Sequence, residues 1–372
     1  MSQITTEVDV EDFLRGANFM SASGGGEPVI EREHLLADVA AGRAIGWRSL
    51  EEFDDDDVLV CCCYSGSIAP ESFDDPTDRA LALGGGPKFE RPFVNAAEML
   101  TAHLGVDLGG FISVEIGGIN AGAILGAAAA SGVPLADADY AGRAIPELPS
   151  TGLAMHGEKV LPFAMVDHFG NEILISASPS LGWIERIAKQ AALSSLGLIA
   201  CAFAALPARR AREIAVPGTM SECLALGRAI RLAREAGEDP VAAAAAALDG
   251  WVLFRGAVSE RDWVNNGYME GTHTLAGTGE FAGHALKVWF RNENHVTWLD
   301  GVAWAASPDL IEFCDPETAE PLVNTYLEKG QEIAVVGRRR RDQFDNDGGL
   351  EVMGPRHWGF DLDFRGVEAL VA

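Results

Sequence analysis

The chain has 372 residues, of which 48% are hydrophobic and 22% are charged. This length suits two domains, and this composition excludes an intrinsically disordered protein, which would contain far fewer apolar residues. The formal net charge of −27 repels nucleic-acid phosphates and anionic lipids, so we expect neither nucleic acid nor a membrane as a partner.

The start of the chain and its cysteines indicate a reducing compartment. Residues 1–16 are polar and acidic and lack the basic and apolar regions of a secretory signal. The six cysteines have neither the spacing of a disulfide framework nor that of a Cys-x-x-Cys metal site. We therefore expect a cytoplasmic protein.

In the first half of the chain, helix-like and strand-like segments alternate. The pattern predicts helices over residues 9–20, 31–41, 95–104 and 121–131, and strands over 58–66, 111–116 and 133–138. Such alternation favours a mainly parallel sheet covered on both faces. We predict an α/β domain over residues 1–165.

The second half is different. Residues 159–178 predict two strands joined by a tight turn, and helices are predicted over 182–206, 219–236 and 240–248. Thr219 and Glu222 have the spacing of a capping box at the start of the second helix. Short strands are then predicted over 251–258, 270–277, 283–291, 295–299, 302–306, 310–314, 332–336 and 350–353.

This run of strands is typical of a β-rich sandwich or barrel-like unit. The fold class is therefore α/β, or α+β overall. The C-terminal domain, residues 166–372, combines helices with the β-rich unit. We expect the two domains to pack closely and to share a cleft.

The candidate reaction site lies between residues 112 and 147. Two strand-like pieces there end in acidic residues and are followed by residues that start a helix or a turn. We expect these ends to meet at one edge of one sheet and to form a catalytic site from Glu115, Asp137, Asp139, Arg143 and Glu147, with Asn120 beside them.

Asp137 and Asp139 are two residues apart on a strand, so their side chains point to the same face. Two close carboxylates do not both ionise easily, so one can act as the acid and the other as the base. A divalent metal site or a turn cap are the other interpretations of this pair. On the catalytic interpretation, replacing Asp137 by Asn abolishes turnover.

The other residues also have two interpretations. Glu115 either takes part in the reaction or accepts hydrogen bonds from the amides that follow it. Arg143 either holds a substrate carboxylate or imide oxygen, or neutralises a neighbouring acid. Cys61, Cys62 and Cys63 lie in a strand with no nearby histidine, which argues against a thiolate nucleophile.

The candidate substrate-binding residues come from both domains. The amides of Gly24, Gly25 and Gly26 either hold an anion or carbonyl group, or form an ordinary loop. The polar segment that contains Asn292, Asn294 and His295 is either a turn or the second domain's contribution to the cleft. Arg356 follows a Gly-Pro pair and has the same two interpretations.

Motifs along nearly the whole chain resemble one protein family. They are SASGGGEP (21–28), VEIGGIN (114–120), DADYAGRAIPE (137–147), DHFGNEILI (167–175), WIERIAKQAALSSLG (183–197), FRNENHV (290–296), SPDLI (307–311), EKGQEIAVVG (328–337) and GPRHWGFDLDF (354–364). In this order they resemble the S-methyl-thiohydantoin desulfurase family, whose genes often lie beside hydantoinase genes.

The resemblance implies a two-domain protein that removes sulfur hydrolytically from a thiohydantoin ring and leaves a hydantoin. The chain departs from the family at CCCYSGSIAPES (61–72), at Ile145, where the family usually has an aromatic residue, and at Leu148-Pro149, where it usually has Gln-Met. These positions belong to the expected pocket, so the substrate differs from the nominal one if the departures are functional.

We therefore expect a cytoplasmic hydrolase that acts on a cyclic amide or thiohydantoin-like small molecule in an interdomain cleft. No cofactor is certain, and a divalent metal ion at Asp137 and Asp139 stays open. We expect a homo-oligomer, with a hydantoinase-like protein as a candidate partner. Two alternatives stay open: a non-catalytic subunit of a hydantoinase or oxoprolinase-like complex, and a metabolite-binding sensor.

Overall fold

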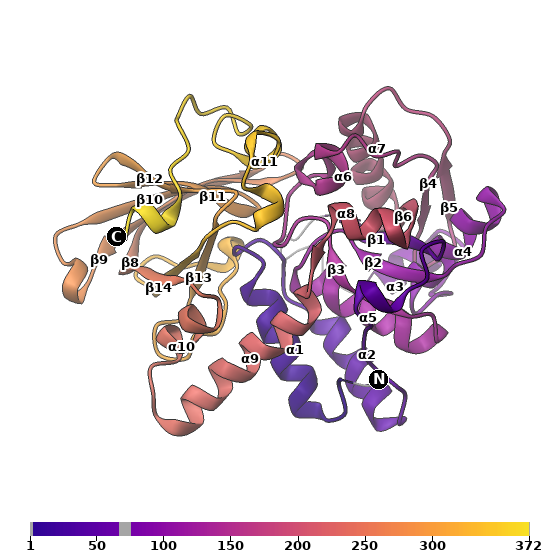
Figure 1. Ribbon diagram of the computed structural model, residues 1–372, viewed down its shortest axis with the longest axis horizontal. Coiled ribbons are helices and arrows are strands. Elements are labelled where there is room, and N and C mark those ends of the chain that lie inside the picture. Colours follow the sequence, from indigo (N-terminus) through magenta and orange to yellow (C-terminus); the bar gives the residue numbers. More distant parts are fainter. Residues whose placement is uncertain (1–2, 67–75, 372) are drawn as a thin grey trace.

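Two seven-stranded β-sheets organise the molecule (Figure 1). The structure, a computed structural model, describes residues 3–66 and 76–371. The strands of the first sheet lie between residues 58 and 217, and those of the second between 251 and 338. In Figure 1 the first sheet lies on the right and the second, in orange, on the left.

The first sheet has the strand order β5-β4-β6-β1-β2-β3-β7. Its strands are β1 (Val58–Gly66), β2 (Gly110–Ser113), β3 (Leu135–Asp139), β4 (Phe163–Val166), β5 (Glu172–Ile175), β6 (Leu198–Pro207) and β7 (Val216–Pro217). The expected domain division at 165/166 falls within β4, and strands from both sides of it pair in this one sheet.

The first sheet is mixed as a whole, and its parallel part consists of the three strands predicted for the N-terminal α/β domain. Only β1, β2 and β3 run parallel to one another, and the other pairings are antiparallel. The β4–β5 pair is a hairpin, and a hairpin can pair only in the antiparallel sense. The parallel part is the one that carries the candidate acids.

Helices cover both faces of the first sheet. One face packs against α4 (Pro92–Leu104) and α5 (Gly118–Ser131), and α1 (Glu7–Phe19) and α2 (Val29–Ala40) pack on the outer side of α5. The other face packs against α7 (Leu181–Ser194) and α8 (Ala208–Ile214). The side chains of β1 alternate between these two groups of helices. Val60 and Cys62 lie on the face covered by α4 and α5, and Cys61 and Cys63 lie on the face covered by α7 and α8.

The second sheet is antiparallel throughout, in the order β12-β11-β10-β9-β8-β14-β13. The β-rich unit expected after residue 250 is thus confirmed. Its strands are β8 (Trp251–Asn265), β9 (Met269–Gly277), β10 (Ala285–Arg291), β11 (Glu293–Leu299), β12 (Val302–Ala306), β13 (Leu310–Cys314) and β14 (Glu332–Arg338).

The remaining elements are short, apart from α9. The helices are α3 (Thr77–Ala82), α6 (Gly152–Met155), α9 (Thr219–Ala236), α10 (Pro240–Ala247) and α11 (Asp347–Met353). Short 3-10 helices span Leu50–Glu52, Leu148–Ser150, Gly279–Phe281, Asn324–Tyr326, Asp342–Phe344 and Val367–Ala369.

Helices α1 and α9 lie side by side below the two sheets (Figure 1). They approach closely because glycines stand at the contact. A Cβ atom at Gly16 would lie 1.8 Å from the carbonyl oxygen of Cys223, and one at Gly227 would lie 1.7 Å from that of Asp12. This contact ties the helix that precedes the second sheet to the first domain.

Two element predictions were wrong. Residues 182–206 are not one helix, because α7 ends at Ser194 and β6 begins at Leu198. Leu196 and Gly197, which lie between the two elements, both have positive φ, and this ends the helix. The prediction failed because a long apolar run does not itself distinguish a buried strand from a buried helix. The strand expected at 350–353 is part of α11.

The capping prediction for α9 was also wrong. Gly218 is the N-cap residue, and no side chain of its own segment caps the helix. Asp137, in the middle of β3, does this instead. Its Oδ1 accepts hydrogen bonds from the backbone N–H of Met220 and of Ser221, at 2.9 and 3.0 Å.

Candidate functional site

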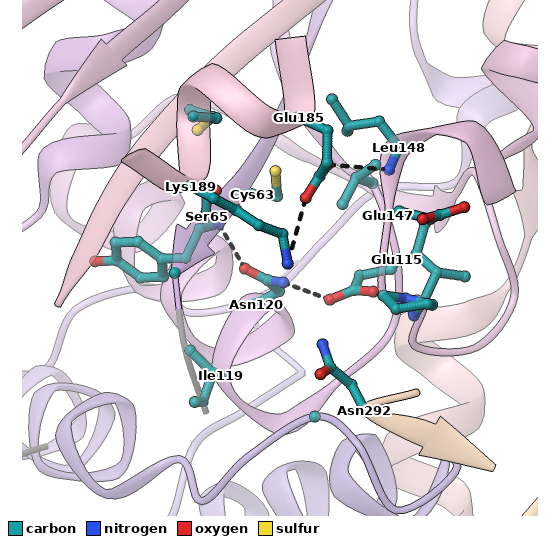
Figure 2. A pocket seen from close by; sticks show the side chains of 18 of the residues that line it. Cys63, Ser65, Glu115, Ile119, Asn120, Glu147, Leu148, Glu185, Lys189 and Asn292 are labelled. Atoms are coloured by element: carbon teal, nitrogen blue, oxygen red, sulfur yellow. Dashed lines mark hydrogen bonds and ion pairs between the residues drawn. The ribbon is translucent and has the colours of Figure 1, made fainter. Parts of the chain in front are cut away.

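A pocket that is open to solvent lies where the first sheet, α7 and the β10–β11 turn meet, with about 780 Å³ of empty space that includes part of the solvent at its mouth (Figure 2). Its wall comes from segments far apart in the sequence. The lining residues are Gly24, Gly25, Cys63, Tyr64, Ser65, Gly66, Val114, Glu115, Ile119, Asn120, Ile145, Pro146, Glu147, Leu148, Phe163, Glu185, Ala188, Lys189, Leu198, Cys201, Asn292 and Glu293.

Glu115 lies just beyond the end of β2 and is only 8% exposed. Its Oε1 accepts a 2.5 Å hydrogen bond from Nδ2 of Asn120, and its Oε2 accepts one of 2.6 Å from the backbone N–H of Ile145. Burial outweighs these hydrogen bonds and raises the pKa of Glu115 to about 7. This carboxyl therefore exchanges a proton near neutral pH.

Asn120, in the first turn of α5, fixes the orientation of Glu115. Its Oδ1 accepts a 2.8 Å hydrogen bond from the backbone N–H of Tyr64, so its Nδ2 is the group that faces Glu115. The hydrogen-bonded chain from Tyr64 through Asn120 to Glu115 joins β1, α5 and the end of β2. The polar wall of the pocket is thus built into the sheet.

Glu185 and Lys189 stand one turn apart on α7, with side chains 13% and 16% exposed and a separation of 3.7 Å between Oε1 and Nζ. Glu185 accepts a 3.2 Å hydrogen bond from the N–H of Leu148. Burial lowers the pKa of Lys189 and raises that of Glu185. Figure 2 shows this pair across the cavity from Glu115.

Lys189 also links α7 to the second sheet. Its Nζ donates a 2.9 Å hydrogen bond to the carbonyl oxygen of Gly267 and lies 3.5 Å from the centre of the Tyr268 ring. Both residues belong to the turn between β8 and β9. The ammonium group is therefore held at the pocket by contacts from α7 and from the β8–β9 turn of the second sheet.

Asn292 and Glu293 reach the pocket from the β10–β11 turn. Asn292 has φ of +54°, a conformation that Asn tolerates better than most residues, and its Oδ1 accepts a hydrogen bond from the N–H of Met269. Glu293 is 2% exposed, and its Oε2 has no hydrogen-bond partner among the described residues. Burial, and then the charge of Glu115, raise the pKa of Glu293 well above its usual value.

Glycine at position 24 leaves room for the side chain of Glu293. A Cβ atom there would lie 2.4 Å from Oε1 of Glu293. Gly24 and Gly25 both line the pocket, whereas Gly26 does not. The glycine loop thus makes room for a buried carboxyl, which is a different role from the anion cradle considered from the sequence.

Glu147 lines the rim of the pocket in an ionised form. Burial alone would raise its pKa, but a 2.9 Å hydrogen bond with Nε2 of His357 and the charges of His357 and Arg291 lower it. Oε2 of Glu147 lies 3.8 Å from Nη1 of Arg291. Of the acids expected here, Glu115 and Glu147 come together in one pocket.

The structure does not bring Asp137 and Asp139 to this pocket. Asp137 caps α9, and its Oδ2 also accepts a hydrogen bond from Oγ of Ser221. Asp139 is fully buried, and its Oδ2 accepts hydrogen bonds from the N–H groups of Ala141 and Gly142, at 3.0 and 2.6 Å. Burial raises the pKa of Asp139 to about 7. Both carboxyl groups accept hydrogen bonds from backbone N–H groups, as a turn-capping residue does.

Arg143 is buried away from the pocket and binds backbone oxygens. Its Nη1 donates to the carbonyl of Asp309 at 2.9 Å and its Nη2 to that of Asn294 at 2.8 Å. Burial lowers its pKa to about 10. Arg143 thus bridges the two domains. Its charge favours ionisation of the buried acids Glu293 and Glu312, not of Asp137 or Glu147 as considered from the sequence.

Three other candidates also lie outside the pocket. Asn294 donates to the carbonyl of Ile311 and accepts from Asn324. His295 is buried, with Nδ1 3.2 Å from Oγ of Ser307. Arg356 is exposed and pairs with two aspartates of its own loop. Only Asn292 of that polar segment's named candidates lines the pocket.

No metal cluster is present among residues 3–66 and 76–371, since no group of three or more His, Cys, Asp or Glu side chains is arranged to hold an ion. Over the same residues, no helix is long and apolar enough to span a membrane. All six cysteines are free and buried.

Of the positions at which the chain departs from the family, Cys63–Gly66, Ile145 and Leu148 line the pocket. Residues 67–72 of that segment lie outside the described residues.

Sequence reasoning missed Glu185 and Lys189. Their i, i+4 spacing in a helix was visible, but such a pair is ordinarily a solvated ion pair on the helix surface. Glu293 stood inside the polar segment 292–295 and was not singled out. The missing information was that α7 and the β10–β11 turn lie against the edge that carries Glu115.

The fold and pocket define a two-domain protein with a buried acidic site at the domain junction. The chain belongs to the S-Me-THD-like family: residues 8–177 match the family's N-terminal domain and residues 179–367 its C-terminal domain.

A crystal structure of a protein from Chromobacterium violaceum, a structural genomics target, is similar, with a TM-score of 0.73. The two are 19% identical, over 97% of this chain and 99% of that one. At this identity the likeness shows the shared fold alone. No curated protein matches the sequence.

Proposed function

We propose that this protein is a hydrolase that removes sulfur from a small thiohydantoin-like ring bound in the Glu115 pocket. The observation that carries the proposal is Glu115 itself. It is a buried carboxyl with a pKa of about 7, oriented by Asn120, on the wall of a cavity large enough for a small ring. Membership of the S-Me-THD-like family supports the substrate class.

In this proposal Glu115 is the general base. Water adds to the ring carbon that bears sulfur, while the ionised carboxylate of Glu115 takes one proton from the water. The carbon–sulfur bond then breaks, and the two protons of the water end on the ring nitrogen and on the released thiol. A carboxyl with a pKa near neutrality suits this role, since it is partly ionised and still basic at pH 7.

Glu293 supplies the acid. Its raised pKa keeps it protonated, so the unpartnered Oε2 can donate a proton to the ring nitrogen or the departing sulfur. Burial, and then the charge of Glu115, separate the two roles, because ionising one carboxyl opposes ionisation of the other. Lys189 offers a positive charge to the ring carbonyl oxygen.

The test is release of methanethiol from a panel of S-methyl-thiohydantoins and of hydrogen sulfide from unsubstituted thiohydantoins, in which both protons of the water leave with the sulfur. Glu115→Gln keeps the shape of the side chain and removes its basicity, so we expect kcat to fall about 100-fold or more. Glu293→Gln is expected to behave similarly. Glu332→Gln, at an exposed position on β14, is the matched control and is expected to keep wild-type kinetics.

Unchanged thiol release in Glu115→Gln would remove this assignment. Thermal stabilisation of the wild type by a ring compound, with no product released, would favour the sensor. Activity that appears only with a co-purified hydantoinase-like protein would favour the subunit role.

A further inference from the structure

Cys63 and Cys201 stand directly opposite each other on neighbouring antiparallel strands. The register of β1 and β6 pairs Cys63 with Cys201, and both residues line the pocket that holds Glu115. The Sγ of Cys201 donates a 3.6 Å hydrogen bond to the carbonyl oxygen of Ile199. Among the described pairs of these strands, no other cysteine faces a cysteine, since Cys61 pairs with Phe203 and Cys62 with Ala202.

This placement satisfies the main geometric condition for a disulfide. Opposing residues of an antiparallel pair have Cα atoms about 4.5 or 5.5 Å apart, depending on their hydrogen-bonding position. Disulfide-linked residues have Cα atoms about 4.4 to 6.8 Å apart. Cβ atoms across such a pair need to approach by about 1 Å or less for the bond to close. The strands therefore need no rearrangement.

We propose that Cys63 and Cys201 form a reversible disulfide in the pocket wall when the protein meets a hydroperoxide. Two S–H bonds break and one S–S bond forms. The two electrons and two protons pass to the hydroperoxide, whose O–O bond breaks to give water and an alcohol, or two waters from hydrogen peroxide. The proposal depends on strand register and not on the reaction assigned to Glu115.

The surroundings of Cys63 determine how a hydroperoxide reaches its thiol and how fast the thiol is oxidised. Cys63 is 7% exposed and opens on the pocket, whereas Cys61, Cys62, Cys201, Cys223 and Cys314 are fully buried. The adjacent thiol of Cys201, together with burial, raises the pKa of Cys63 well above that of an ordinary thiol. Because the thiolate is the reacting form, oxidation is slow at neutral pH and accelerates as the pH rises.

Peptide mapping of the folded, full-length protein tests this. After treatment with hydrogen peroxide and blocking of free thiols, trypsin releases residues 49–79, which contain Cys61–Cys63, and residues 190–209, which contain Cys201. We expect these two peptides to be joined by one disulfide. We also expect two of the six thiols to be lost and to return on treatment with dithiothreitol.

Two variants make the result specific. Cys63→Ser and Cys201→Ser are each expected to abolish the linked peptide and the reversible loss of thiols. Cys62→Ser, on the opposite face of β1, is expected to leave both unchanged. Circular dichroism on each variant confirms that it is folded.

The proposal is overturned if all six thiols of the folded wild type survive peroxide over pH 7 to 9. It is equally overturned if Cys201→Ser loses thiols as the wild type does, or if peptide 190–209 is joined to a peptide other than 49–79. None of these outcomes requires knowledge of the substrate, so failure here leaves the hydrolase proposal to its own test.

Discussion

Asn120 and Glu115 are joined by a hydrogen bond of 2.5 Å from Nδ2 to Oε1. The bond spans the start of α5 and the end of β2, and the N–H of Tyr64 on β1 fixes which end of the Asn120 amide faces the carboxylate. It stabilises the charged form of Glu115 against burial. After burial and the N–H of Ile145, Asn120 is therefore the next influence on the pKa of Glu115.

Replacing Asn120 by Ala removes this hydrogen bond, so the pKa of Glu115 rises further. We expect the acid side of the kcat/KM pH profile, set in the wild type near pH 7, to move to higher pH. At a pH well above the shifted pKa of Glu115, the variant regains part of its activity, because the carboxyl is then ionised. Asn346→Ala, at the N-cap of α11, is the control and should leave the profile unmoved. A uniform loss of rate at all pH values would contradict the positioning role.

Glu115 also makes the stability of the protein depend on pH. Its pKa is raised from 4.5 to about 7 on folding, so the folded protein keeps a proton that the unfolded chain releases above pH 4.5. The stabilisation from this proton is present below pH 4.5 and is lost as the pH rises through about 7. Above that pH, ionised Glu115 destabilises the fold by on the order of 3 kcal/mol.

Glu115→Gln removes this ionisation. The Tm of the variant relative to wild type is therefore expected to shift in the variant's favour between pH 5 and pH 8, measured by thermal unfolding at several pH values. The comparison uses the pH trend, because loss of native hydrogen bonds lowers stability by a similar amount at every pH. A difference in Tm that stays constant over this range would show that Glu115 has an ordinary pKa.

Asp137 is expected to matter for stability and not for turnover, which reverses the expectation drawn from the sequence alone. Asp137→Ala removes the cap of α9 and should lower the free energy of unfolding by about 1 to 2 kcal/mol in urea titrations. Asp137→Asn keeps an acceptor oxygen and should lose less. Both variants should retain wild-type kcat, and loss of turnover in a folded Asp137→Asn protein would restore the catalytic interpretation.

Arg143 is expected to hold the two domains together. Arg143→Met fills the same space but leaves the carbonyls of Asp309 and Asn294 without a donor. We expect a loss of about 2 to 4 kcal/mol in the free energy of unfolding, since buried acceptors then lack partners. Arg356→Met, at an exposed position, is the control. Equal stabilities of the two variants would contradict the bridging role.

The sequence by itself determined most of the secondary structure and the family. A continuous apolar run placed β1, and two strand-like segments around a tight turn placed the hairpin of β4 and β5. The run of strands after Trp251 was recognisable from the spacing of its turns. The sequence also identified Glu115 as a buried acid next to a strand end. These signals are local, because they depend on side chains a few residues apart.

Only the tertiary structure decided which acids meet. Asp137 looked catalytic because it is polar at a strand end, but the start of α9, more than eighty positions later in the chain, lies against it and uses it as a cap. Glu185, Lys189 and Glu293 reach Glu115 from α7 and from the second sheet. Burial raises the pKa of a carboxyl only once distant segments have excluded water from it, and sequence spacing does not show which segments those are.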